Sequence, residues 1–457
     1  MHNYQQRLDY HNTMTGKKEN DLSFQIFILA ILVSSTFYVV PLSRFEYFGT
    51  DFRLFDFVFA FFFLTVGLNK LSDVIQLLKK KKTFFWWISI LLVLVWFSLA
   101  MTFATGGTAK VLPAIIRGIR FTAYLFTGVY VVVLVDTSQK FRWILRILYI
   151  NIIIQAALST AQRLGWLGSL WPYYYTSIYG ELPVGTLSAH HKQIGVVMLI
   201  GLGISLSYIR TRKNIFTRFI NIFFMGLMIS ASVFAVSRTA WLGMAGMALG
   251  YFFIYKNRSI GMLILLIIGL FSSFFLLERI GVDISGVLQE DINRVFLNRI
   301  EQQGLEGVAG DRFTVYETVP ERIARNPWIL LIGTGFQNQS TFFYGSGAHN
   351  NYLHVWMELG IFGFIIYMGM LHNILLDLRK VRVKVQDSLE NTYAQDVFAV
   401  FVGILFTMLV GETLWAQPSM QTMTAQIMIM VGLGVAPFYF DKNFNDEKKQ
   451  IDFRQGR

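Results

Sequence analysis

The amino-acid sequence predicts an all-α polytopic membrane protein with about 12 transmembrane helices and a helical cap between spans 9 and 10. Of its 457 residues, 54% are apolar and 15% are charged, whereas about a quarter of the residues in a soluble domain are charged. The 43 Phe, 20 Tyr and 10 Trp residues would overfill a single soluble core, so the excess apolar surface must face lipid. These proportions exclude an ordinary soluble globule, and the absence of Cys excludes disulfides and thiol chemistry.

Apolar runs near the length of a bilayer span recur along the chain. A transmembrane helix needs roughly 20 mostly apolar residues, and flanking charges mark where each run ends. The twelve runs are 24–40, 52–68, 84–103, 114–135, 141–161, 194–209, 219–236, 239–255, 260–277, 352–376, 397–411 and 420–440. The predicted organisation is a tail over 1–23, spans 1–9 over 24–277, a cap over 278–351, spans 10–12 over 352–440 and a tail over 441–457.

The basic residues lie mostly on one side of the predicted membrane. Of the 40 Lys and Arg residues, 26 occupy the two tails and the even-numbered connectors, 8 occupy the short odd-numbered connectors, and 6 occupy the long ninth connector. Because connectors rich in Lys and Arg stay in the cytoplasm, both tails are predicted to be cytoplasmic. The net charge of +12 is therefore mostly a topology signal, and no nucleic-acid partner is expected.

The ninth connector, residues 278–351, is 74 residues long and lies on the extracytoplasmic side. Structureless loops of more than roughly 15 residues are uncommon unless they have a function. Within it, residues 288–303 and 311–325 have the apolar spacing of helices. The sequence therefore predicts a small helical cap over the membrane domain.

Arg238 lies in a very short turn between spans 7 and 8. An Arg near a helix end commonly extends to phospholipid headgroups, and this interpretation is favoured when Arg238 is considered alone. The functional interpretation is an anion site. A tight helical hairpin holds the guanidinium still, and its rigid fork of donors matches phosphate oxygens.

His349 lies at the start of span 10, after a Gly-rich stretch and before Asn350. A lone His at a helix start is more often an interfacial side chain than a catalyst. In this polar cluster, however, a neutral imidazole would accept a proton near physiological pH. His354 and Glu358 lie four residues apart on one helix face, where a structural hydrogen-bonded pair is favoured over a metal site.

Three other basic residues are candidate anion ligands at the extracytoplasmic face. Lys192 precedes span 6, where a helix N-terminus attracts anions, although a Lys before a span is also a common topology marker. Arg117 and Arg120 lie three residues apart at the outer end of span 4. The predicted extracytoplasmic connectors contain no DxD or ExD carboxylate pair to hold a divalent cation, so no metal site is predicted.

Three groups of these residues follow one another in a recognisable order. They are Ser237-Arg238; Asp311-Arg312 with Tyr316, Pro327 and Gly333-Thr334-Gly335; and His349-Asn350 with Tyr352, Leu353, Glu358 and Gly360. This pattern resembles the O-antigen polymerase and ligase superfamily of bacterial envelope glycosyltransferases. The resemblance covers residues 188–363, and the remaining chain is similar in span number and orientation only.

The resemblance implies transfer of a glycan from an undecaprenyl-diphosphate carrier to a sugar hydroxyl, with inversion and without a metal or other cofactor. The reaction would take place at the periplasmic face of the bacterial inner membrane, so the cap would be periplasmic. Arg238 and Arg312 would stabilise the diphosphate leaving group, and His349 would be the general base. The expected substrate-binding residues are Lys192, Arg117, Arg120, Asn350 and Tyr352.

Several alternatives remain open within and outside the enzyme class. The His191-Lys192 element favours a polymerase, while a ligase to lipid A core and a protein O-oligosaccharyltransferase share the same motifs. A lipid-linked oligosaccharide flippase would place its charges along a path within the membrane, and a scaffold would not need Arg238, Arg312 and His349 together. Expected partners are the lipid-linked glycan donor, a glycan or lipid A core acceptor, membrane lipid, and a co-polymerase that regulates chain length.

Overall fold

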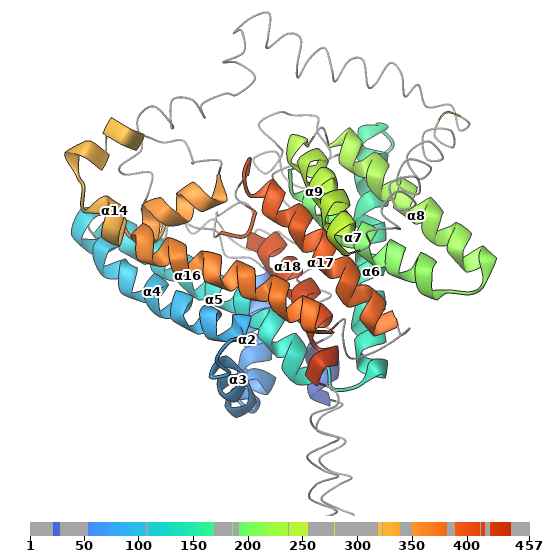
Figure 1. Cartoon of the computed structure of the whole chain (residues 1–457), viewed down its shortest axis with the longest axis horizontal. Coiled ribbons are helices and arrows are strands. Elements are labelled where there is room, and N and C mark those ends of the chain that lie inside the picture. Colours follow the sequence, from blue (N-terminus) through green and yellow to red (C-terminus); the bar gives the residue numbers. More distant parts are fainter. Residues whose placement is uncertain are drawn as a thin grey trace, which may run out of the picture.

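The computed structural model describes the helical framework of the chain. The described residues are 22–27, 54–106, 108–168, 185, 192–235, 237–254, 278, 319–321, 323–338, 350–381, 389–411, 413–415 and 421–439. Within these ranges every regular element is a helix and no strand occurs (Figure 1). The predicted all-α class is therefore confirmed for this part of the chain.

Six of the described helices are long and apolar enough to cross a membrane. They are α4 (Phe84–Gly106), α5 (Thr108–Leu134), α6 (Ser138–Arg163), α7 (Lys192–Thr211), α8 (Ile215–Phe234) and α16 (Asn351–Val381). Predicted spans 8, 11 and 12 correspond to α9 (Arg238–Ile254), α17 (Leu389–Thr407) and α18 (Gln421–Val435), which are not among these six. The chain is thus a membrane protein. The number of 12 spans stays a prediction, because most of the first predicted span and all of the ninth lie outside the described residues.

The second predicted span ends in a sharp bend. Helix α2 (Leu54–Phe62) continues as the π-helix η2 (Phe63–Gly67), and α3 (Leu71–Leu78) then turns away by 95°. The predicted connector between spans 2 and 3 thus contains a helix of its own. Val74 and Leu77 bury one face of α3, so this helix packs against the molecule instead of extending α2.

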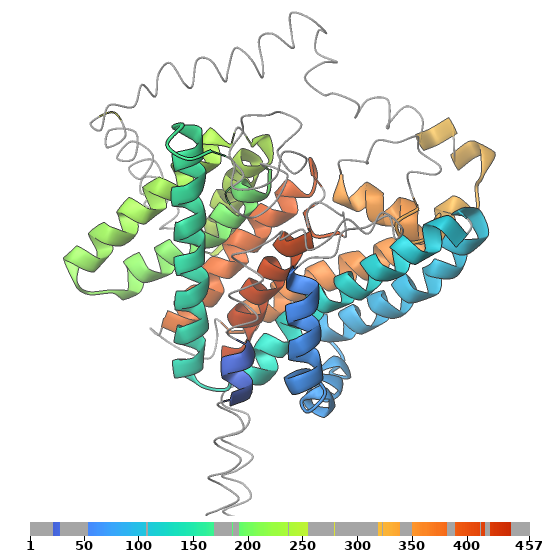
Figure 2. The same ribbon diagram turned by 180° about the vertical axis from the view of Figure 1, so that it is seen from behind.

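Helix pairs that are distant in sequence form the core. Helix α17 packs against α9 and α7, α18 against α5, and α16 against α4 (Figure 1). Seen from behind, α4 and α5 form one flank, and α6 with the α7–α8 hairpin forms the other (Figure 2). A Cβ on Gly403 of α17 would lie 2.5 Å from the carbonyl oxygen of Gly243 on α9. Only glycine allows the two backbones to approach so closely.

Helix α16 is broken at Gly360. This residue has φ 67° and ψ −171°, outside the helical region, so the helix predicted over 352–376 is present but has a break at this point. Glycine takes positive φ without the steric cost that a side chain adds. Within a membrane, such a break must be compensated by new partners for the released backbone groups.

The predicted cap is described only in part. Residues 319–321 and 323–325 are helical, in agreement with the predicted helix over 311–325. They lead to the short helix α14 (Ile329–Ile332), which packs against α16. The predicted helix over 288–303 lies outside the described residues.

Candidate functional site

The N-termini of α7 and α9 lie side by side. Ser237 caps α9, because its Oγ accepts a hydrogen bond from Ala240 N at 3.3 Å. A Cβ on Gly195, in the first turn of α7, would collide with Ala240 and would lie 3.1 Å from Ser237 Oγ. The backbones of Lys192 and Arg238, the first residues of α7 and α9, therefore begin two adjacent helices at one end of the molecule.

The C-terminal end of α17 connects this region to the start of α16. Asn351 N donates a hydrogen bond to Met408 O at 2.8 Å. A Cβ on the nearby Gly411 would lie 3.6 Å from Thr239 Oγ1 in the first turn of α9. The N-termini of α7, α9 and α16 thus converge at the same end of the molecule.

Asn350 is the N-cap of α16. Its Oδ1 accepts hydrogen bonds from Tyr352 N at 3.0 Å and from Leu353 N at 3.1 Å, which satisfies two of the free donors of the first turn. Two of the three predicted catalytic residues, His349 and Arg312, lie outside the described residues. The side chains of Lys192 and Arg238 are likewise not described, so the roles of these four residues stay predictions.

A buried polar network holds the first half of α16. His354 Nε2 and Glu358 Oε1 are 2.9 Å apart, which is the hydrogen-bonded pair that the spacing predicts. Trp415 Nε1 donates to the other carboxylate oxygen of Glu358 at 2.8 Å. Asn351 Oδ1 accepts from the backbone N–H groups of Leu414 and Trp415, at 3.1 and 3.0 Å. Across the described residues, no group of three or more His, Asp or Glu side chains could share a metal ion.

The Gly333-Thr334-Gly335 segment clamps the break in α16. Thr334 N donates to Met357 O at 2.8 Å, and Gly335 N donates to Glu358 O at 3.0 Å. These two N–H groups replace the helical donors that the break at Gly360 removes. Gly333 and Gly335 both have positive φ, 74° and 96°, and a Cβ on Gly333 would collide with the Glu358 carbonyl.

The same segment is also tied to α4. Thr102 Oγ1 donates to Phe336 O at 2.9 Å, and Phe336 N donates to Ser98 Oγ at 3.2 Å. Asn338 Nδ2 donates to Thr105 Oγ1 at 2.5 Å. The segment that follows the cap is therefore fastened between α4 and α16, and the start of α16 has a fixed position.

Arg117 and Arg120 have separate environments, although the sequence places them on one helix face. Arg120 is 3% exposed and binds the carboxylate of Asp56 through Nε and Nη2, with Nε at 2.8 Å from Oδ1 and Nη2 at 2.5 Å from Oδ2. Arg117 Nη1 donates to Gln337 Oε1 at 3.1 Å. Residues 333–338, the clamp segment, thus lie next to Arg117, whereas the charge of Arg120 is compensated by a carboxylate.

Tyr352 is directed into the helix packing. Its hydroxyl donates to Leu405 O of α17 at 3.0 Å. This contact fastens the first turn of α16 to α17, and the predicted role of Tyr352 in substrate binding stays a prediction.

Comparison with known families adds independent evidence for these motifs. Residues 223–368 match the family model described as O-antigen ligase. The match confirms the resemblance to the O-antigen polymerase and ligase superfamily, and it covers less than half of the chain. A search of curated proteins gives no match.

The O-antigen ligase match includes all of α9 and α14 and α16 as far as residue 368. Lys192, Arg117 and Arg120 lie outside it, as do the α4 residues and Trp415 that hold its C-terminal part in place. The matched segment therefore depends on contacts from both ends of the chain.

Sequence reasoning missed two residues of this region. Asp56, the partner of Arg120, is a single carboxylate inside an apolar run, and such a residue in a predicted span is by itself a signal. Trp415 follows predicted span 11 and has no local pattern that points to Glu358.

Proposed function

We propose that the chain is a membrane glycosyltransferase that moves a glycan from an undecaprenyl-diphosphate carrier to a sugar hydroxyl at the periplasmic face. The observation that carries the proposal is the convergence of the N-termini of α7, α9 and α16. Each helix N-terminus carries a partial positive charge from the helix dipole, which attracts phosphate groups even where Ser237 and Asn350 cap the first N–H groups. Lys192 and Arg238 begin two of these helices and add full charges.

The donor side of the reaction requires stabilisation of negative charge. As the bond from the sugar anomeric carbon to the diphosphate oxygen breaks, its electron pair moves to the leaving diphosphate. We assign Arg238 and Arg312 to this charge, because a guanidinium placed in advance stabilises it without a cation. Neither a metal nor an organic cofactor takes part in the proposed reaction.

The acceptor side requires removal of a proton. The acceptor hydroxyl attacks the anomeric carbon from the face opposite the diphosphate, which inverts the configuration, and His349 takes the hydroxyl proton. His349 directly precedes the capping residue Asn350. The clamp at Gly333-Thr334-Gly335 and the Glu358–Trp415 bond support a rigid position for this end of α16.

We favour a polymerase, in which the acceptor is a second lipid-linked repeat unit. Such an acceptor has its own diphosphate, and Lys192 with Arg117 would bind it. Arg120 is a weaker candidate for that role than Arg117, because Asp56 compensates its charge. The description of the matched family favours the second candidate, an O-antigen ligase that transfers the glycan to lipid A core.

The deciding experiment gives the purified protein lipid-linked repeat units as the only substrate. A polymerase produces a ladder of longer lipid-linked chains. Transfer only after lipid A core is added would identify a ligase. If neither acceptor receives glycan, while lipid-linked glycan crosses a vesicle membrane containing the protein, the enzyme assignment is wrong.

The same assay tests the metal-free mechanism. Turnover should persist in EDTA, because the proposed charge stabilisation comes from Arg238 and Arg312. Loss of turnover with recovery upon addition of a divalent cation would contradict this mechanism. It would make His354 and Glu358 candidate metal ligands.

A further inference from the structure

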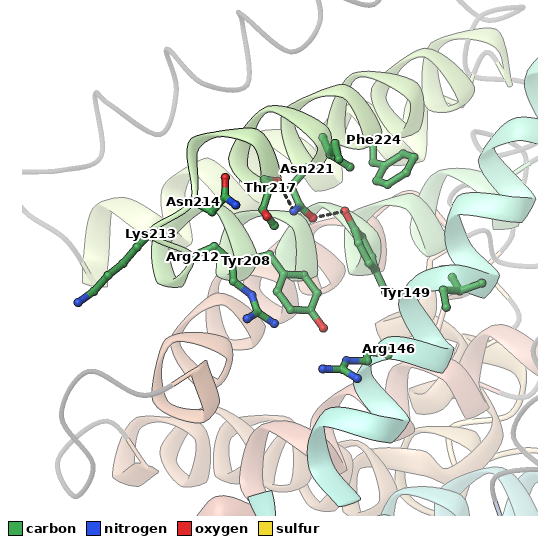
Figure 3. A pocket seen from close by; sticks show the side chains of 11 residues that line it. Arg146, Tyr149, Tyr208, Arg212, Lys213, Asn214, Thr217, Asn221 and Phe224 are labelled. Atoms are coloured by element: carbon green, nitrogen blue, oxygen red, sulfur yellow. Dashed lines mark hydrogen bonds between the residues drawn. The ribbon is translucent and has the colours of Figure 1, made fainter. Parts of the chain in front are cut away.

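A cavity lined by basic and apolar side chains lies at the opposite end of α7 from Lys192. It has a volume of about 630 Å³, and its walls come from α6, the C-terminal end of α7 and the first turns of α8 (Figure 3). Helix α7 has 20 residues and is therefore about 30 Å long, close to the thickness of a bilayer core. This cavity is thus separate from the candidate glycosyltransfer site, and in the predicted orientation it lies at the cytoplasmic face.

Basic side chains dominate the charge of the cavity. Arg146 of α6 and Arg212 at the end of α7 point toward the same space, and the hydroxyl of Tyr208 lies near both guanidinium groups (Figure 3). The Arg212 guanidinium also lies over the Tyr208 ring, 5.6 Å from its centroid. Lys213 adds a third positive charge at the rim, and no Asp or Glu is among the residues that line the cavity.

Two arginines near the cavity, Arg142 and Arg210, form ion pairs with carboxylates. Arg142, one turn before Arg146, lies 3.3 Å from the carboxylate of Glu390. Arg210, two residues before Arg212, is paired with the buried Asp396. Arg146 and Arg212 instead face a cavity whose described lining contains no carboxylate, so this space has a positive potential suited to an anion.

The floor of the cavity is rigid and has its own hydrogen bonds. Tyr149 OH donates to Asn221 Oδ1 at 2.8 Å, and Asn221 Nδ2 donates to Thr217 O at 2.7 Å (Figure 3). Asn221 is 5% exposed. These bonds join α6 to α8 and engage the polar groups of Tyr149 and Asn221, which leaves the guanidinium groups as the principal ligands for an anion.

Apolar side chains continue from the cavity toward the membrane interior. Ile150 lines the cavity one turn beyond Arg146 and is 55% exposed, and Ile154, one turn further along α6, is 41% exposed. On α8, Phe224 lines the cavity and its neighbour Phe223 is 45% exposed. A soluble anion would leave this apolar surface uncovered, whereas the acyl chains of a lipid would cover it.

We propose that this cavity binds the headgroup phosphate of an anionic phospholipid from the cytoplasmic leaflet. Arg146 and Arg212 contact the phosphate oxygens, and the acyl chains lie along Ile150 and Phe224. Basic pockets between transmembrane helices at the cytoplasmic side bind headgroups of this kind. The bound lipid joins α6 to the α7–α8 hairpin, independently of the reaction at the other end of α7.

The test titrates delipidated protein in detergent with phosphatidylglycerol or cardiolipin, and with phosphatidylcholine for comparison. Native mass spectrometry measures lipid retention, and the unfolding midpoint measures stabilisation. The anionic lipids should bind and raise the midpoint, whereas phosphatidylcholine should not. The double variant Arg146→Ala, Arg212→Ala should bind the anionic lipids roughly 30-fold more weakly.

Lys79→Ala is the matched control, since Lys79 is an exposed basic residue near the same predicted face that does not line the cavity. It should bind anionic lipid like the unmodified protein. Equal loss of binding in this control would reduce the effect to general surface charge and overturn the site. Unchanged binding of anionic lipid in the double variant would also overturn the proposed site.

Two further measurements keep the proposal testable. If the double variant does not fold, the single variants Arg146→Gln and Arg212→Gln should each weaken binding roughly 5-fold. Inorganic phosphate and diphosphate, added without lipid, should leave the unfolding midpoint unchanged. If they stabilise the protein as much as the anionic lipids do, the site belongs to a soluble anion and the lipid proposal is wrong.

Discussion

The indole Nε1 of Trp415 donates a hydrogen bond to Glu358 Oε2 at 2.8 Å, and both side chains are fully buried. The Trp415 ring also packs against Phe121, Phe336 and Tyr367, with ring centroids 5.0, 5.7 and 5.6 Å apart. This one side chain therefore joins α5, the clamp segment and both halves of α16. It contributes to the position of α16 together with the bonds from Thr334 and Gly335.

Trp415→Phe should destabilise the protein by about 1–3 kcal/mol, because it leaves a carboxylate oxygen of Glu358 buried without its donor. The unfolding midpoint in detergent measures this effect. Trp356→Phe is the matched control, since Trp356 Nε1 makes only a 3.4 Å contact with Leu330 O. An equal loss in both variants would mean that the Glu358 bond contributes nothing specific.

Gly360→Ala should reduce both folding yield and turnover. A Cβ at Gly360 would collide with the Leu331 carbonyl, and positive φ strains a side-chain-bearing residue by about 1–3 kcal/mol. Gly118→Ala on α5 should be tolerated, because the nearest atoms would lie 3.8 Å away and Ala favours a helix. Normal expression and turnover of Gly360→Ala would show that α16 does not need this break.

Asp56→Asn should destabilise the protein by about 3–5 kcal/mol, because it leaves the buried Arg120 guanidinium without a compensating charge. The measurement is again the unfolding midpoint. Asp73→Asn removes an exposed carboxylate that lies 3.7 Å from Lys70 Nζ and should change stability by less than about 1 kcal/mol. Comparable effects of the two substitutions would contradict a structural role for Asp56 and Arg120.

His349→Ala should lower turnover on the order of 10²- to 10⁴-fold while leaving protein level and donor binding near normal, as expected for loss of a proton acceptor. Arg238→Lys and Arg312→Lys should also lower turnover, because the ammonium group of a flexible Lys side chain does not replace the bidentate hydrogen bonding of a guanidinium. The ladder assay with lipid-linked repeat units provides the measurement. Full turnover in any of these variants removes that residue from the proposed mechanism.

Reporter fusions test the predicted orientation. Fusions after Lys82, Lys213 and Lys384 should report the cytoplasm, and a fusion within 304–310 should report the periplasm, because basic connectors are retained in the cytoplasm. A cytoplasmic signal from 304–310 would place the candidate glycosyltransfer site on the wrong side of the membrane. It would also reverse the leaflet assigned to the phospholipid cavity.

Local patterns in the sequence are sufficient for the features that depend on neighbouring residues. The length of apolar runs predicts helices such as α4 to α8 close to their observed bounds. The four-residue spacing of His354 and Glu358 predicts their hydrogen bond, because residues four apart share a helix face. The motif residues likewise predict the superfamily that the family comparison supports.

Features that depend on distant partners require the folded chain. Arg117 and Arg120 share a helix face, yet Gln337 and Asp56 draw their side chains into separate environments. Gly360 is one glycine among several in its helix, and it breaks α16 because donors on Thr334 and Gly335 satisfy the released carbonyls. Apolar length and spacing act within a few turns, whereas these hydrogen bonds join segments that meet only when the helices pack.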